Sequence, residues 1–162
     1  MAMVDYFLKI DGVEGESNDA KHKDEIQVLS FSFGEQQSGT FAFGGGGGAG
    51  KVQMHDFHFM MNVCKASPKL FLKCANGEHI KNATLTARKA GKDQQDYLKV
   101  TFTDCLVSSF TTNGDGSANT MPLESISINF AKIEMEYKEQ KADGTLGAGH
   151  KTGYSLKEMK AT

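Results

Sequence analysis

The chain has 162 residues and a mass of 17.6 kDa, with 39% hydrophobic and 23% charged residues. This length and composition predict one folded domain over residues 1–162. The net charge of −2 and the pI near 6.2 argue against nucleic acid as the main partner.

The N-terminus has no basic segment followed by a long apolar stretch, so we expect no secretory signal peptide. No apolar run approaches the roughly 20 residues that a membrane helix needs, which argues against membrane insertion. Cys64, Cys74 and Cys105 cannot all pair and lack metal-ligand spacing. These features are typical of synthesis in a reducing cytoplasm, and any export would avoid the general secretory route.

Alternating apolar residues predict a mainly β fold. In residues 26–33, 52–61 and 123–139 the apolar positions change parity, which indicates a bulge or a bend between sheets. Such long, bent strands favour two sheets forming a closed or nearly closed β-barrel. In residues 97–111 the apolar positions are even-numbered and include Leu106. The strands are expected at residues 5–10, 26–33, 52–61, 79–89, 97–111, 123–139 and 151–157.

One short helix is expected at residues 68–76. Ser67 is the expected N-cap, and Pro68 stands at the first helical position, where its missing N–H costs nothing. Gly77 supplies the left-handed position that ends the helix. The apolar stripe of this helix, which should cover one side of the barrel, consists of Leu70, Phe71 and Cys74.

Residues 44–51 read GGGGGAGK and nearly form a phosphate-binding loop. Gly45, Gly50 and Lys51 fit the spacing G-x-x-x-x-G-K, but Val52 stands where Ser or Thr should hold magnesium. The following residues alternate like a strand, whereas a phosphate loop opens a helix. We therefore expect a connection between strands and no nucleotide binding.

The candidates for metal or catalytic chemistry are weak. His55 and His58 are three residues apart in a predicted strand, so they point to opposite faces. The other histidines, and the acidic residues of the polar segment 11–24, are interpreted as surface groups. The sequence thus predicts no enzyme, no metal and no cofactor. These surface groups are His22, His79, His150, Glu14, Glu16 and Asp19.

Small uncharged polar residues line one face of several predicted strands. Threonine on an exposed sheet often reflects β propensity alone. Solvent-exposed faces normally carry Lys and Glu, however, so the pattern also suits the wetted, uncharged wall of a channel. The pattern by itself leaves both interpretations open. The residues are Ser30, Ser32, Thr84, Thr86, Thr101, Thr103, Ser125, Ser127 and Asn129.

A series of short motifs follows a fixed order along the chain. They are DYFLKI from Asp5, GES from Gly15, HKDEI from His22, FSFG from Phe31, the glycine run ending in AGKV, SPKL from Ser67, RKAG from Arg88, LVSS from Leu106, NFA from Asn129 and KADG from Lys141. In order and spacing they resemble the haemolysin-coregulated proteins (Hcp) of the bacterial type VI secretion system. The chain departs from these proteins in lacking the Trp that they often carry at the positions of Phe31, Phe33 and Tyr154.

The resemblance implies a β-barrel with one helix on its side, and six copies in a ring with a wide hole. Rings would stack into the inner tube that a contractile sheath drives into a neighbouring cell. Expected partners are other copies, sheath and spike components, and effector proteins carried in the ring. Ser32 and Ser30 would face the hole. The residues expected to reach the next ring are Gly45, Gly46, Gly47, Gly48, Ala49 and Lys51.

A different class of function remains open on the residues alone. A monomeric β-barrel that binds a small apolar ligand would place apolar residues around an internal cavity. It predicts a cavity and no ring, whereas the tube subunit predicts a ring.

Overall fold

A computed structural model describes residues 4–39, 51–89 and 94–162. Within these ranges the chain is mainly β with one short helix, as predicted. The elements are β1 (Val4–Ile10), β2 (Ile26–Val28), β3 (Ser30–Ser32), β4 (Glu35–Gln36), β5 (Gln53–Met54), β6 (Phe57–Asn62), α1 (Ser67–Asn76), β7 (Ile80–Lys89), β8 (Asp96–Asn113), β9 (Leu123–Gln140), β10 (Leu146–Ser155) and β11 (Lys160–Ala161).

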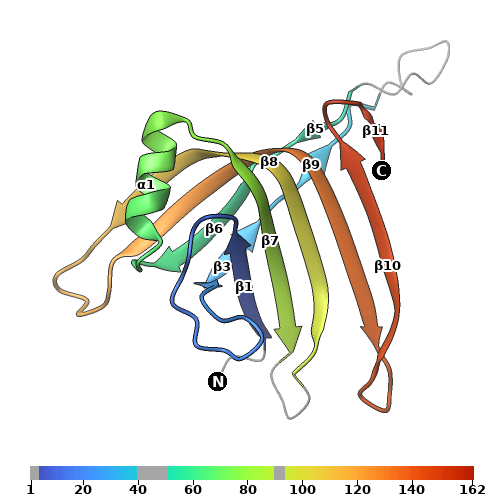
Figure 1. Cartoon of the computed structure of the whole chain (residues 1–162), viewed down its shortest axis with the longest axis horizontal. Coiled ribbons are helices and arrows are strands. Elements are labelled where there is room, and N and C mark those ends of the chain that lie inside the picture. Colours follow the sequence, from blue (N-terminus) through green and yellow to red (C-terminus); the bar gives the residue numbers. More distant parts are fainter. Residues whose placement is uncertain (1–3, 40–50, 90–93) are drawn as a thin grey trace.

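A single curved sheet dominates the molecule, and its described strands pair antiparallel in the order β11-β10-β9-β8-β7-β1-β2. β6 joins this sheet by pairing with both β9 and β3, while β4 and β5 form a separate pair. Figure 1 shows that this sheet is strongly curved. The expected mainly β fold with one helix on its side is confirmed, although no pairing among the described strands joins β2 to β11, so the sheet is not closed.

The bend in β8 depends on a residue in the left-handed region. Asp104 has a φ of 54°, and Phe102 and Cys105 on either side of it both face the core, although they are three residues apart. A bulge follows further along, where the register with β9 shifts between Val107 and Ser109. The expected even-numbered alternation is therefore wrong at Leu106, although Phe110 again packs against the core. Val107 is buried, whereas Leu106 is only half-buried.

The parity change in residues 26–33 marks the point where the chain exchanges one neighbouring strand for another. Val28 pairs with Tyr6 in β1, and Ser30 pairs with Met60 in β6. Between them the Leu29 amide donates a hydrogen bond to the Met60 carbonyl at 2.8 Å. The segment is therefore two short strands joined at Leu29, as the predicted bend requires.

The helix begins one residue earlier than predicted. Ala66 occupies the N-cap position, and no side chain caps the helix. The Ser67 hydroxyl cannot cap because it accepts a hydrogen bond from the Cys64 amide and donates one to Glu124. Gly77 ends the helix in the left-handed conformation as predicted, with a φ of 69°. In Figure 1 the helix lies beside β8, which it contacts.

The core lies inside the curl and is rich in aromatic rings. The rings of Phe57 and Phe102 stack with centroids 4.6 Å apart, and Phe130 lies 4.9 Å from Phe102. Leu8 and Leu85 complete this layer from β1 and β7 and are also fully buried. Burying such large apolar side chains is the main favourable contribution to folding.

Phe7 points to the opposite side of β1, where the polar segment 11–24 covers it. His22 stacks on the Phe7 ring at 4.4 Å and lies between Glu25 and Asp96, with its ring nitrogens 2.9 and 3.1 Å from their carboxylates. His22 is 6% exposed, so its prediction as a surface residue is wrong. His22 is buried because its ring packs flat against the apolar ring of Phe7.

Arg88 anchors the same segment from β7. Its side chain is 3% exposed, and its guanidinium lies 2.8 Å from the Asp19 carboxylate and 3.4 Å from that of Asp5. The hydrogen bond from Arg88 holds the pKa of Asp19 well below its usual range. The prediction that Asp19 belongs to a solvated charged face is therefore wrong, because this charge has a buried partner.

Asp19→Asn tests this anchor. A carboxylate whose pKa is lowered by folding adds stability above its unfolded-state pKa of about 3.9, and this stability is lost as the pH falls through the folded-state value. We expect the variant to lose about 1.5–3 kcal/mol at pH 7, the usual range for a hydrogen bond to a charged group. Below about pH 4, its stability should fall less steeply than that of the wild type. Urea denaturation at pH 7 and pH 3 measures both effects. Asp11→Asn, at an exposed position, is the control, and parallel pH profiles for Asp19→Asn and the wild type would contradict the assignment.

Candidate functional site

A patch of small and uncharged side chains crosses four neighbouring strands on the side away from the core. Residues directly opposite one another on paired strands project from the same face of a sheet. The register of β3, β6, β9 and β8 therefore gathers eight residues into two rows. These residues, here called the polar face, are Ser30, Met60, Ser125 and Thr111 in one row and Ser32, His58, Ser127 and Ser109 in the other.

Hydrogen bonds within the polar face join its side chains across strands. The Ser109 hydroxyl donates to the Ser127 hydroxyl at 2.7 Å, and the Ser127 oxygen lies 2.5 Å from His58 Nδ1. Ser127 is 5% exposed, so this network is partly shielded from solvent. Three of the eight side chains thus bond to one another, and none of the eight residues is Lys, Arg, Asp or Glu.

Ser30 and Ser32, which the sequence singled out, both belong to the polar face. They stand on β3, where both are exposed, while Phe31 between them packs toward the core. Neither hydroxyl makes a hydrogen bond with another described residue. These two positions are therefore available to an outside partner.

The threonines that the sequence grouped with these serines lie elsewhere. Thr84 is opposite Thr101, which in turn is opposite Glu134. Lys99 and Lys151 flank this second area, so charged groups surround it. The small polar residues therefore do not form one wall, because the bulge in β8 and the bends of the sheet separate them into two areas.

The two strands that flank the polar face have unpaired edges. β7 pairs with β8 only as far as Cys105, so residues 106–113 of β8 have a described partner strand, β9, on one side alone. β3 likewise pairs with β6 alone among the described strands. Unpaired edges present free N–H and C=O groups and are common sites of association between chains.

The histidines do not form a metal site in the part of the chain that the structure describes. His55 is exposed between β5 and β6, and His58 belongs to the polar face. Across residues 4–39, 51–89 and 94–162, no three His, Cys, Asp or Glu side chains converge as metal ligands would. In the same ranges no helix has both the length and the apolar character to cross a membrane.

Most of the predicted glycine loop lies outside the described residues. Gly45, Gly46, Gly47, Gly48 and Ala49 all belong to the segment that is not described. Lys51 is described and is exposed, two residues before β5.

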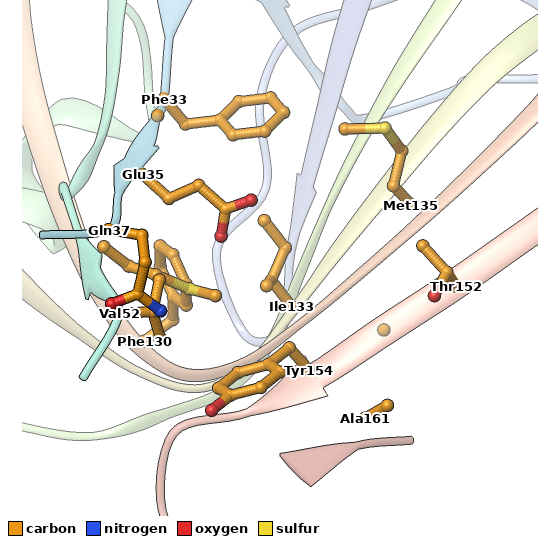
Figure 2. Close-up of a pocket in the computed structure, with 13 residues that line it drawn as sticks. Phe33, Glu35, Gln37, Val52, Phe130, Ile133, Met135, Thr152, Tyr154 and Ala161 are labelled. Atoms are coloured by element: carbon orange, nitrogen blue, oxygen red, sulfur yellow. The ribbon is translucent and has the colours of Figure 1, made fainter. Parts of the chain in front are cut away.

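A pocket of about 480 Å³ opens where β4 and β5 approach β9 and β10. Figure 2 shows the Glu35 carboxylate pointing into a space bordered by the rings of Phe33 and Tyr154. Ile133 and Met135 of β9 line the same space. This volume and apolar lining are typical of a ligand site. Sequence reasoning missed the pocket, because its walls come from five separate strands and the segments next to them.

Comparisons with known proteins give a consistent result. Residues 7–137 match the family described as "Type VI secretion system effector, Hcp". The chain is 43% identical over 157 residues to Protein hcp1 of Pseudomonas aeruginosa, which covers 96% of each chain. The crystal structure of Hcp1 from Salmonella typhimurium matches with a TM-score of 0.84 and 37% identity, covering 99% of this chain and 100% of that one. A structure described as a type six secretion system protein has a TM-score of 0.93 and 29% identity, over 98% and 99% of the chains.

The sequence and fold comparisons therefore agree over almost the whole length of the chain. Ring assembly is known for the proteins to which it is similar, and their role is that of a secreted tube subunit. The chain belongs to the Hcp family and is a subunit of the type VI secretion tube.

Proposed function

We propose that the polar face lines the central hole of a six-membered ring and that effector proteins are carried against it. The observation that carries this proposal is a four-strand face of eight side chains without a formal charge. Exposed sheet faces usually carry interspersed Lys and Glu, so this composition needs a reason. A wall that must let different proteins slide past supplies one, since it should neither hold nor repel a charged cargo.

Ser30 and Ser32 are the cargo contacts in this proposal. Their hydroxyls are exposed and make no hydrogen bond with another described residue, unlike those of Ser109 and Ser127. A free hydroxyl donates and accepts, and can therefore bind backbone or side-chain groups of many proteins. Contacts of this kind are individually weak, which suits a cargo that must later be released.

The ring would close head-to-tail through the two unpaired edges. β3 stands on one side of the polar face and residues 106–113 of β8 stand on the other. If the β3 edge of one copy lies beside the β8 edge of the next, the polar face continues from copy to copy. Contacts between two different surfaces generate a closed ring when the rotation between copies is suitable.

The proposal assigns the protein a structural and carrier role, without an enzymatic step. The partners are other copies, the sheath and spike of the secretion machine, and effector proteins. The protein would be made in the cytoplasm and leave the cell with the tube. The glycine loop, including Lys51, would dock against the adjacent ring.

A second candidate is a monomeric barrel that binds a small apolar ligand. The 480 Å³ pocket favours it, because its walls are largely apolar and its size suits a small molecule. The mass of the purified protein separates the two. The mass of a ring, together with particles that show a central hole in electron micrographs, supports the tube proposal. The mass of a monomer at micromolar concentration supports the ligand-binding barrel.

Ser32→Gln tests the cargo role. The longer side chain narrows the hole and occupies the free hydroxyl position, so we expect about tenfold less of a co-expressed effector protein to be recovered with the ring. The mass of the ring and its melting temperature should not change, because Ser32 is exposed. Thr101→Gln is the matched control, since Thr101 lies outside the polar face. Full recovery of the effector by intact Ser32→Gln rings would show that Ser32 does not face the cargo.

Hydrogen exchange tests the edges. Comparison of assembled rings with protein dissociated by dilution should show slower amide exchange on assembly in β3 and in residues 106–113, by about tenfold or more. The reason is that a neighbouring copy shields free N–H groups from water. β7, with a partner strand on each side, should change little. Protection confined to other segments would place the ring contact elsewhere.

A further inference from the structure

The pocket between β4–β5 and β9–β10 is called here the corner pocket. It contains an acidic side chain, Glu35, that has no ion-pair partner among the described residues. Glu35 stands opposite Met54 on β5 and points into the pocket (Figure 2). Phe33, Ile133 and Met135 supply apolar walls, and Met135 is 37% exposed. A carboxylate without an ion-pair partner in the described ranges, beside partly exposed apolar side chains, suits a partner that brings one cation and a small apolar surface.

The corner pocket lies at the C-terminal end of β10, and the turn between β9 and β10 lies at the other end of that strand. In Figure 1, β5 and β11 appear near the upper end of β10, and the β9–β10 turn appears at its lower end. If copies stack in the same orientation, the end with the pocket meets the end with the turn. Such stacking repeats one contact between two different surfaces, which is how open, linear assemblies grow.

The β9–β10 turn is a preformed protrusion. The Lys141 amide donates to the Thr145 carbonyl at 2.8 Å, and the Gly144 amide donates to the Lys141 carbonyl at 2.9 Å. Gly144 has a φ of 88°, a conformation that glycine adopts without strain. An ordered turn loses little conformational entropy when it binds. This turn contains the KADG motif that the sequence analysis singled out.

The charges on the turn leave one group free for a partner. Asp143 accepts hydrogen bonds from the Thr145 hydroxyl at 2.6 Å and the Thr145 amide at 2.9 Å, and these bonds lower the pKa of Asp143. Lys141, in contrast, is exposed and makes no ion pair with a described residue. Ala142 beside it is exposed and small. The tip therefore presents one cation next to a small apolar side chain.

We propose that the β9–β10 turn of one copy enters the corner pocket of a copy in the adjacent ring, where the Lys141 ammonium faces the Glu35 carboxylate. This inference rests on the proposed function, since it requires rings. The turn covers the apolar walls of the pocket, and the ion pair fixes the register between rings. It also provides a reason for the pocket in a tube subunit, namely that it is a socket for a second copy of the chain.

A charge swap tests the contact. Glu35→Lys and Lys141→Glu each place like charges together, so each should weaken stacking of preformed rings at least tenfold. The double variant, which exchanges the two charges, should recover stacking to within about threefold of the wild type. Sedimentation and negative-stain images of concentrated protein measure tube length, and light scattering measures the mass of the single ring.

The outcomes separate this contact from the proposed function. Lys69→Glu on α1 is the control, since Lys69 is exposed at a different part of the molecule, and it should stack normally. Three results would each overturn the contact. The single variants could stack like the wild type, the double variant could stack no better than either single variant, or wild-type rings could stay single at millimolar concentration. In all of these cases intact rings leave the proposed function standing, whereas a wild-type monomer would remove both.

Discussion

The structure depends on two long strands that each serve two neighbours. β8 and β9 each span 18 residues, and the first part of β9 pairs with β6 while its last part pairs with β10. Where such a strand bends from one neighbour to the next, the positions that face the core can change from even-numbered to odd-numbered. In β8 the change occurs at Asp104, which adopts a left-handed conformation. As a result, Phe102 and Cys105 are both buried in the core.

Buried ion pairs and uncharged polar side chains lie on different surfaces of the molecule. Arg88 of β7 and His22 of the polar segment 11–24 are buried with carboxylate partners, and they fix that segment over Phe7. In the polar face, in contrast, the described hydrogen bonds join uncharged residue types such as Ser109 and Ser127. Buried ion pairs give a segment one defined position. A neutral wall gives passing proteins no preferred position, which is what a conduit requires.

Assembly gives a common explanation for features that a monomer leaves unused. The two unpaired edges beside the polar face, the open pocket with Glu35 and the rigid turn with Lys141 are each incomplete in one copy. In the proposed assembly, side-by-side contacts through the edges extend a ring, and end-to-end contacts through the pocket extend a tube. The two kinds of contact use different surfaces, so a single chain can provide both.

The sequence by itself determined the local features and the family. The alternation of apolar residues predicted a mainly β fold, the parity change near Leu29 predicted a bend, and Gly77 predicted the end of the helix, because each depends on neighbours in the chain. Only the tertiary structure decided the burial of His22 and the separation of Thr101 from Ser127, and it also decided the walls of the pocket. These depend on contacts between residues far apart in sequence, such as Arg88 with Asp5, 83 positions away. Local patterns contain no information about which distant strands will pair or what will cover them.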